Sequence, residues 1–420
     1  MTIKLGMGRS SALDVMRRMK LDTISIGRDR LNIAVKDRAN LFPWNGQFSP
    51  QLIEAILRTY ARPDDLVLDP FLGSGTVLCE AGRLGLPCFG VEINPAAFKM
   101  ARTYRFLNAS PDEREGAFDE IGASLQDVIP DSLPIFRGAA PEVGSAELQR
   151  AVVALSSNPS SEWSAILLDA LIILLDFYKE DSTATRVFAT WEKLKATVAV
   201  LPSSRAPVGL ANTDARSLPL APSVVDLVVT SPPYINVFNY HQQYRASAEA
   251  LGWDLLKVAR SEIGSNRKNR GNRFLTVIQY CLDLTGVLLE LMRVCKPGAR
   301  MILVVGRESS VRKTRFFNGE IVAALAARCA GLVPEVRQER VFKNRFGALI
   351  YEDILHFRNE RSDAELIDPL EIAVAALTAA IEHAPDESKA DLMAALGGAA
   401  NVRPSPIYAP ARATPIRTAT

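Results

Sequence analysis

The stretch that decides the fold is Asp65-Leu-Val-Leu-Asp-Pro-Phe-Leu-Gly-Ser-Gly-Thr76. A short apolar run of strand length ends at an acid, Asp69, and a glycine-rich loop then leads into a helical segment, residues 77–83. Glycines at 73 and 75 let the backbone approach a ligand closely, and the free amides of the following helix point at the same place. The stretch therefore predicts a nucleotide-type loop in an α/β sheet. The three-glycine spacing of dinucleotide-binding loops is absent, which disfavours a pyrophosphate site.

Two more acids follow predicted strands along the chain. Residues 88–91 form the next predicted strand, and Glu92 lies at its end. In a doubly wound sheet an acid at this place accepts hydrogen bonds from ribose hydroxyls. Asp214, in Ala-Asn-Thr-Asp-Ala-Arg, ends a third strand. Because ligands in open α/β sheets bind at the carboxyl ends of the strands, these acids and the glycine loop predict one shared site.

A proline-rich turn follows another apolar strand. Residues 226–234 read Asp-Leu-Val-Val-Thr-Ser-Pro-Pro-Tyr. Two consecutive prolines fix φ and remove two backbone donors, so the Pro232 carbonyl is held as a rigid acceptor beside the Ser231 hydroxyl. Tyr234 offers an aromatic face and a phenol. Together they describe a clamp for the exocyclic amine of a nucleobase, although a strand ending in an ordinary proline turn is the alternative.

These two motifs carry a family resemblance. Residues 69–76 resemble the cofactor loop, and residues 231–234 the catalytic motif, of S-adenosylmethionine-dependent DNA amino-methyltransferases of the N4-cytosine and N6-adenine type. The resemblance implies a Rossmann-like, seven-stranded class I methyltransferase sheet, S-adenosylmethionine as cofactor and double-stranded DNA as substrate. The catalytic residues it implies are Ser231, Pro232, Pro233 and Tyr234. The cofactor-binding residues it implies are Asp69, Phe71, Gly73, Ser74, Gly75, Thr76, Glu92, Asp214 and Phe48.

The resemblance also implies roles for these residues. Phe71 and the glycine loop would cradle the methionine part of the cofactor, Glu92 would hold the ribose and Asp214 would meet the adenine amine. Residues 40–57, which include Phe48, are similar to the family's N-terminal segment that closes over the cofactor. His241 and Tyr244 are candidates for the base pocket, with a surface or core role equally compatible.

The target base is inferred from the first residue of the catalytic motif. In the family, serine at this position is the more usual pattern for cytosine N4, and Asp or Asn for adenine N6, so cytosine N4 is favoured over adenine N6. An RNA base amino-methyltransferase and a non-catalytic cofactor-binding subunit also stay open. Cytosine C5 methylation is disfavoured because it needs a thiolate, and Cys88 begins a predicted strand as a buried structural residue.

Composition indicates a cytoplasmic enzyme without a metal. The five cysteines have no paired metal spacing and there are only three histidines, so no metal site is expected. Scattered thiols indicate a reducing cytoplasm. The N-terminus lacks a secretory pattern, and the most apolar run, residues 165–178, is too short and too charged to span a membrane.

A basic loop is the candidate DNA contact. The net charge of the chain is only +2, but residues 264–273 read Gly-Ser-Asn-Arg-Lys-Asn-Arg-Gly-Asn-Arg and contain no acid. Cations neutralise phosphates, and Asn contacts phosphate or base edges; a solvated flexible loop is the alternative. The predicted DNA-binding residues are Arg267, Lys268, Arg270 and Arg273. Arg307, Arg312, Lys313 and Arg315 form a second, diluted basic stretch.

The two motifs lie on either side of a long insertion. We expect an N-terminal extension (1–35), a catalytic domain in two parts (36–107 and 205–360), a helical insert (108–204), a C-terminal helical segment (361–400) and a disordered tail (401–420). The insert is not notably basic, so target recognition and dimerisation both stay open as its role. A restriction nuclease partner and a homodimer are likewise open.

Overall fold

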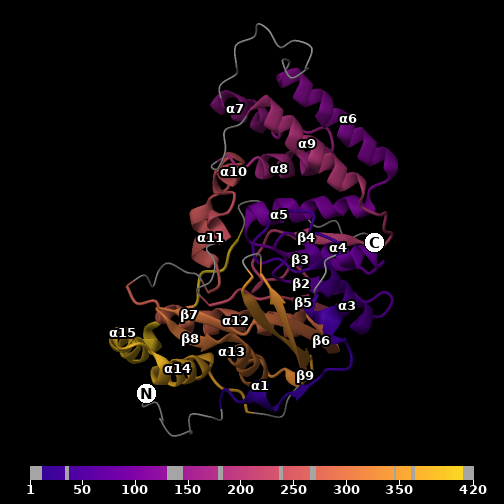
Figure 1. The fold of residues 1–420 in the computed structure, drawn as a ribbon. Helices are drawn as coiled ribbons and strands as arrows, with labels where there is room; N and C mark the ends of the chain where they lie inside the picture. The colour runs from indigo at the N-terminus through magenta and orange to yellow at the C-terminus, as the bar shows by residue number, and fades with distance from the viewer. Residues whose placement is uncertain are drawn as a thin grey trace.

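A mostly parallel sheet of eight strands forms the centre of the molecule (Figure 1). The computed structural model describes residues 12–33, 37–129, 145–177, 183–235, 240–264, 271–344, 347–360 and 365–409. In sheet order the strands are β1 (Lys20–Leu21), β9 (Val333–Lys343), β10 (Leu349–Arg358), β6 (Cys295–Gly306), β5 (Val225–Thr230), β2 (Val67–Asp69), β3 (Cys88–Val91) and β4 (Val208–Ala211).

The strand order confirms the predicted class of fold. Strands β2 to β6 are parallel and are arranged in the doubly wound order, with β2 in the middle and the chain crossing back from β4 to β5. The antiparallel hairpin of β9 and β10 completes the seven-stranded methyltransferase sheet. One strand of this sheet was not predicted: the two residues of β1 pair in parallel with β9 and form the edge of the sheet.

Helices cover both faces of the sheet because its strands alternate apolar residues on both sides. Leu227 and Val229 of β5 face one core and Val228 faces the other. The first face packs against α3 (Pro50–Tyr60), which precedes β2, and against α4 (Thr76–Arg83) and α5 (Pro95–Arg102), which follow β2 and β3. The second packs against α12 (Leu275–Val294), α13 (Asn318–Ala324) and α14 (Pro369–Ala380).

Helix α12 is a core helix of this second layer. Among the described residues it is the one helix that is long and apolar enough to span a membrane. However, 67% of its most apolar 18-residue stretch is buried inside the protein. It packs against α14 and β6. The remaining elements on this side and at the chain ends are α1 (Val15–Arg18), α2 (Arg28–Asn32), η6 (Leu325–Cys329), η7 (Ile381–His383), α15 (Asp386–Gly397), η8 (Ala399–Asn401) and the hairpin of β7 (Glu308–Val311) and β8 (Thr314–Phe317).

Helices occupy the described part of the predicted insert. They are α6 (Pro111–Val128), α7 (Ser145–Leu155), α8 (Glu162–Leu174) and α9 (Ala184–Ala199), and η1 (Thr103–Asn108) leads into them from α5. Figure 1 shows them stacked beyond α5 at one end of the molecule. Helix α8 packs on α5, and its apolar residues continue the core of the first face, so the insert is joined to the sheet through α5. Its role stays a prediction.

The prediction of a disordered tail is wrong for residues 401–409. Ser405 and Tyr408 are each 4% exposed. The Ser405 amide donates to Asp283 Oδ1 at 2.7 Å, and the Tyr408 amide donates to Asp214 Oδ2 at 2.8 Å. The composition of this segment is typical of disorder, but buried charged groups elsewhere in the chain satisfy its backbone. We call residues 402–409 the C-terminal strap; residues 410–420 lie outside the described part.

Candidate active site

A cavity of about 920 Å³ opens at the carboxyl ends of the parallel strands. Both predicted motifs line it: the glycine loop after β2 and the Ser-Pro-Pro-Tyr turn after β5. The structure thus brings into one space two segments that are far apart in the sequence. Of the predicted cofactor-binding and catalytic residues, those that line this cavity are Phe48, Phe71, Gly73, Ser74, Thr76, Glu92, Asp214, Ser231, Pro232, Pro233 and Tyr234.

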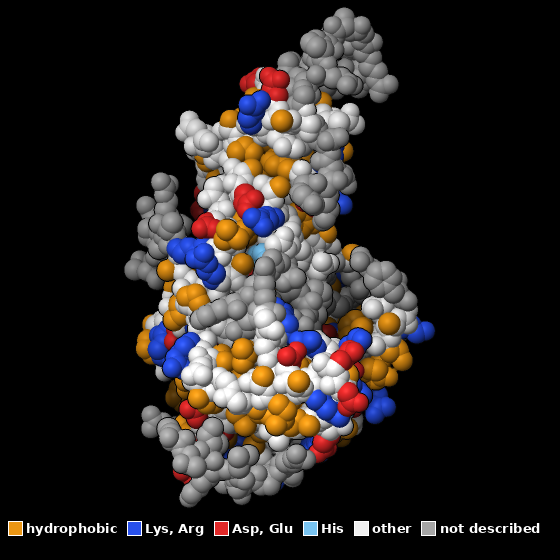
Figure 2. Space-filling view, turned by 90° about the vertical axis from the view of Figure 1, so that its left-hand side faces the viewer, with side chains coloured by type: hydrophobic (Ala, Val, Ile, Leu, Met, Phe, Trp, Pro, Cys, Tyr) orange, Lys and Arg blue, Asp and Glu red, His pale blue; other side chains and the backbone are white. Residues whose placement is uncertain are grey.

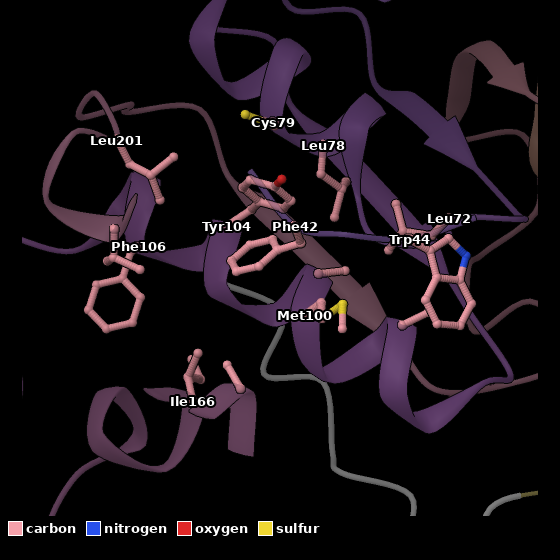
Figure 3. Packing of buried hydrophobic residues seen from close by; sticks show 14 of the residues in the cluster. Phe42, Trp44, Leu72, Leu78, Cys79, Met100, Tyr104, Phe106, Ile166 and Leu201 are labelled. Atoms are coloured by element: carbon pink, nitrogen blue, oxygen red, sulfur yellow. The ribbon is translucent and has the colours of Figure 1, made fainter. Parts of the chain in front are cut away.

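Backbone conformation explains the glycines of the loop. Gly73 has a φ of +53° and Gly75 a φ of +94°, in the left-handed region that favours glycine. A Cβ on Gly75 would lie 2.7 Å from the ring of Tyr104. Figure 3 shows Tyr104 beside Phe42 in the core behind the loop, and their ring centroids are 5.7 Å apart. The buried aromatic pair therefore fixes the loop from behind.

Asp69 and Gly75 support the loop instead of lining the cavity. Asp69 is 1% exposed, and its Oδ1 accepts hydrogen bonds from the Thr230 hydroxyl at 2.6 Å and the Phe71 amide at 3.1 Å. Burial raises the pKa of Asp69 to about 7. Asp69 thus ties the end of β2 to the end of β5, and so holds the loop next to the catalytic turn. Direct contact of these two residues with the cofactor was predicted, and the structure places them behind the wall.

Glu92 is held in the position that the sequence predicted. Its Oε2 accepts from the Gly73 amide at 2.8 Å and its Oε1 from the Asn94 amide at 2.7 Å. Burial raises the pKa of this carboxyl to about 7. Asn94 in turn caps α5, because its side chain accepts from the Ala96 amide at 2.9 Å. Each oxygen of Glu92 keeps one further acceptor position, which is what a ribose diol requires.

Asp214 is in the wall of the cavity, but its hydrogen bonds are already made. Its Oδ1 accepts from the backbone and side chain of Arg216, and its Oδ2 from the Arg216 guanidinium at 2.7 Å and the Tyr408 amide. A carboxylate has about four acceptor positions. All four are filled by the protein, so contact with the adenine amine stays a prediction for Asp214.

The catalytic turn is packed tightly against β6 and β10. The Ser231 Oγ lies 3.3 Å from the Tyr234 hydroxyl oxygen, and that hydroxyl donates to Glu352 Oε1 at 3.4 Å. A Cβ on Gly306, the last residue of β6, would lie 2.9 Å from the Tyr234 ring, so this glycine makes room for the aromatic side chain. Burial raises the pKa of Tyr234 well above its usual value, so it is a neutral phenol.

The predicted base-pocket residues behave differently from each other. His241, in η4 (Tyr240–Gln242), is buried and its Nδ1 pairs with Glu262 Oε2 at 2.7 Å, which is the core role. Tyr244 precedes α10 (Arg245–Ala250), stacks on Trp44 at 6.3 Å, and donates to the Pro43 carbonyl at 3.0 Å. Tyr240 stacks on the same indole. The ring stack joins the N-terminal closing segment to the chain beyond the catalytic turn.

Most of the predicted DNA-contacting loop lies outside the described residues. This applies to Arg267, Lys268 and Arg270, whereas Arg273 is half-buried just before α12. The second basic stretch is paired with acids: Arg307 with Asp353, Arg312 with Asp391, Lys313 with Glu387 and Arg315 with Glu308. Figure 2 likewise shows Lys and Arg side chains interspersed with Asp and Glu on the face that it presents. Over the described residues, this face has no large patch of side chains that all carry the same charge (Figure 2).

Sequence reasoning missed several cavity residues, above all Glu262 and Glu352. Glu262 directly follows α11 (Leu255–Ser261), and Glu352 lies in β10. With Glu92 they place three carboxyl groups in the wall of the cavity, where Glu262 pairs with His241 and Glu352 with Arg340. Among the described residues, no cluster of three or more metal-ligating side chains was found.

Comparisons with known proteins agree with this geometry. Residues 28–103 match the family model described as DNA methylase. The Type II methyltransferase M.MjaII of Methanocaldococcus jannaschii is 38% identical over 55 residues, which cover 13% of this chain and 10% of the relative. M.BglII of Bacillus subtilis is 37% identical over 67 residues, covering 16% and 18%. M.BsoBI of Geobacillus stearothermophilus is 21% identical over 363 residues, covering 61% and 71%.

A solved structure is also similar. It is an S-adenosylmethionine-dependent methyltransferase of Methanosarcina mazei, 13% identical, with a TM-score of 0.33 over 74% of this chain and 98% of that one. Sheet order and glycine loop define the class as a class I methyltransferase fold. The predicted resemblance to S-adenosylmethionine-dependent DNA amino-methyltransferases is confirmed by the family match and the Type II relatives. The chain spans less than a fifth of the length of the first two relatives.

The site fits S-adenosylmethionine, the cofactor of such methyltransferases. Of its two left-handed glycines Gly73 lines the cavity, and Glu92 offers acceptors to ribose hydroxyls. Phe48 and Phe71 add apolar side chains to the wall of the cavity. When bound, the cofactor supplies a methyl group that is already activated for attack.

Proposed function

We propose that the protein is a site-specific DNA methyltransferase that transfers a methyl group from S-adenosylmethionine to the exocyclic amine of a flipped base. The observation that carries the proposal is the single cavity lined by both the glycine loop and the Ser-Pro-Pro-Tyr turn. A target base inside a duplex cannot reach such a cavity, so the nucleotide must be extruded from the stack. Double-stranded DNA is therefore the proposed substrate.

The residues of the turn suit a weak nucleophile. An exocyclic amine is unreactive because its lone pair is delocalised into the ring. Ser231 and the Pro232 carbonyl accept hydrogen bonds from the amine hydrogens and so favour a pyramidal nitrogen. Pro233 keeps the turn rigid, and Tyr234 stacks on the extruded base. Acceptors that are already oriented toward developing positive charge stabilise the transition state by a few kcal/mol each where water is excluded.

Cytosine N4 is the target base that we favour, and adenine N6 is the alternative. The support is the serine at the first position of the motif, where the adenine pattern places Asp or Asn. Further parts of the proposal are a cytoplasmic location and, as partners, a cognate restriction nuclease and a second copy of the chain. Target recognition or dimerisation by the helical insert and DNA contact by Arg267, Lys268, Arg270 and Arg273 belong to it as well.

The product identifies the function directly. DNA from cells that express the protein is digested to nucleosides and analysed by mass spectrometry, with a Tyr234→Ala variant as control. We expect N4-methylcytosine that is absent with the variant. If N6-methyladenine is found instead, the target base is adenine and not cytosine. Methyl transfer to RNA but not to duplex DNA, or methylation that persists in the variant, would contradict the proposal.

Cofactor affinity should depend on pH through Glu92. Its pKa of about 7 means that the carboxyl gains a proton as the pH falls through neutrality, and the protonated form loses acceptor capacity and negative charge. Affinity is therefore highest above pH 7, and the Kd rises by up to about tenfold for each pH unit below it. Isothermal titration calorimetry between pH 6 and pH 8 measures this change.

The Glu92→Gln variant is the control for this prediction. It keeps Asp69, whose pKa is also raised to about 7. We expect weaker binding at pH 8 and a much flatter pH dependence than in the unsubstituted protein. If the Kd changes equally steeply with pH in both proteins, the titrating group is not Glu92.

A further inference from the structure

A line of three polar side chains leads from the catalytic turn to β10. It runs from the Ser231 hydroxyl to the Tyr234 hydroxyl at 3.3 Å and on to Glu352 Oε1 at 3.4 Å. Glu352 belongs to neither predicted motif. Its side chain is 14% exposed and lines the same cavity. Catalytic hydrogen bonds of this length often tighten when the substrate binds.

The direction of these hydrogen bonds decides what Ser231 can do. A hydroxyl has one hydrogen and two acceptor lone pairs, whereas an ionised carboxylate only accepts. Because Tyr234 gives its hydrogen to Glu352, its oxygen is left to accept the hydrogen of Ser231. The Ser231 oxygen then has its own hydrogen turned away and its lone pairs free. In the reverse direction Ser231 would accept the hydrogen of Tyr234, and its own hydrogen would be free to point at the amine.

Arg340 holds Glu352 in the form that this direction requires. Its Nη1 lies 3.1 Å from Glu352 Oε2, and its side chain is 6% exposed. The contact is an ion pair without a hydrogen bond to Oε2, so the guanidinium acts on Glu352 through its charge, while Oε1 accepts from Tyr234. Burial raises the pKa of Glu352, and the charge of Arg340 opposes that rise.

We propose that Glu352 is a positioning residue that sets the direction of this hydrogen-bond line, so that Ser231 presents a lone pair to the amine of the target base. The inference rests on the proposed methylation of an amine in this cavity. It explains how a neutral serine serves as an oriented acceptor: the negative charge is two hydrogen bonds away, on β10. Glu352 acts through Tyr234 and need not touch the base.

Glu352→Gln tests the proposal with little change of shape. The amide oxygen is expected to face the Arg340 guanidinium, which turns the amide NH2 toward Tyr234 and reverses the line. In steady-state assays with tritiated cofactor and duplex DNA we expect kcat to fall about tenfold, with both KM values within about twofold of the unsubstituted protein. An unchanged kcat, or a rise in KM alone, would overturn the proposal.

A double-mutant cycle separates this role from a structural one. Tyr234→Phe keeps the aromatic face and the Glu352–Arg340 pair but removes the central hydroxyl, so kcat should fall while the KM for DNA is kept. In that background Glu352→Gln should have no further effect on kcat, because the residue acts only through Tyr234. Losses of kcat that add up in the double variant would overturn the proposal. If Glu352→Gln does not fold, Tyr234→Phe alone is the test, and an unchanged kcat in that variant would overturn the proposal.

Glu335→Gln is the matched control. Glu335 is an ion-paired carboxylate on the neighbouring strand β9, 2.9 Å from Arg300 and 2.8 Å from Arg358, and it does not line the cavity. The kcat of the Glu335→Gln variant should equal that of the unsubstituted protein. If the unsubstituted protein transfers no methyl group to DNA, the proposed function fails and this inference with it. If it does so and Glu352→Gln keeps full kcat, only the inference fails.

Discussion

Ser231→Ala should lower kcat by about 100- to 1000-fold while leaving the affinity for S-adenosylmethionine unchanged. This is the usual loss when one oriented hydrogen-bonding group is removed from a site that stabilises developing charge. Ser231 lies at the end of β5, beside Tyr234, while the predicted cofactor contacts come from the loop after β2 and from Glu92. Its loss should therefore act on the chemical step. Single-turnover assays with tritiated cofactor measure that step directly.

Ser74→Ala is the matching control in the cofactor half of the same cavity. The Ser74 hydroxyl donates to Gln47 Oε1 at 2.7 Å, which ties the glycine loop to the N-terminal closing segment. We expect this variant to raise the KM for the cofactor by about tenfold with little change in kcat. A Ser231→Ala protein within tenfold of the normal kcat would remove this serine from the proposed mechanism.

Arg216→Met should destabilise the protein by about 3–5 kcal/mol, the cost of leaving buried charges without their partner. The Arg216 side chain is 5% exposed and bridges Asp214 and Asp283, which are 2% and 0% exposed. It also donates to the Ser405 and Pro406 carbonyls of the C-terminal strap. Burial already raises the pKa of Asp283 to about 6, and the Arg216 charge opposes that rise, so removal of the guanidinium should favour protonation of Asp283 and release the strap.

Chemical denaturation, with a midpoint and slope for every transition, measures the loss. Hydrogen exchange of residues 402–409 reports the strap itself. Arg245→Met is the control, because Arg245 pairs with Glu249 on the exposed surface of α10, and it should cost less than about 1 kcal/mol. If Arg216→Met destabilises the protein no more than the control does, and the strap amides stay protected from hydrogen exchange, the cluster does not hold the strap.

Local chemistry made the centre of the fold and much of the site predictable. The strand, glycine loop and helix of residues 65–83 and the strand and proline turn of residues 226–234 each depend on residues close in sequence, so their patterns could be interpreted directly. The sheet order then follows from how parallel strands connect. The cavity confirms that the two motifs meet, which neither pattern could show alone.

What escaped prediction depends on contacts between distant residues. Glu352 reaches Tyr234 only because β10 is inserted between β6 and β9. Asp69 has a typical strand-end pattern, but its carboxylate turns inward to Thr230. The strap has the composition of a disordered tail because its order is supplied by Arg216 and Asp283, which come from elsewhere in the chain.

The strap also has a consequence for how the protein is made. Asp214 belongs to the wall of the cavity, yet one of its hydrogen bonds comes from the amide of Tyr408, nearly two hundred positions later. During synthesis the domain therefore cannot complete this wall until the segment around Tyr408 has emerged from the ribosome. A nascent chain would hold its glycine loop and catalytic turn early, but a finished pocket only after that point.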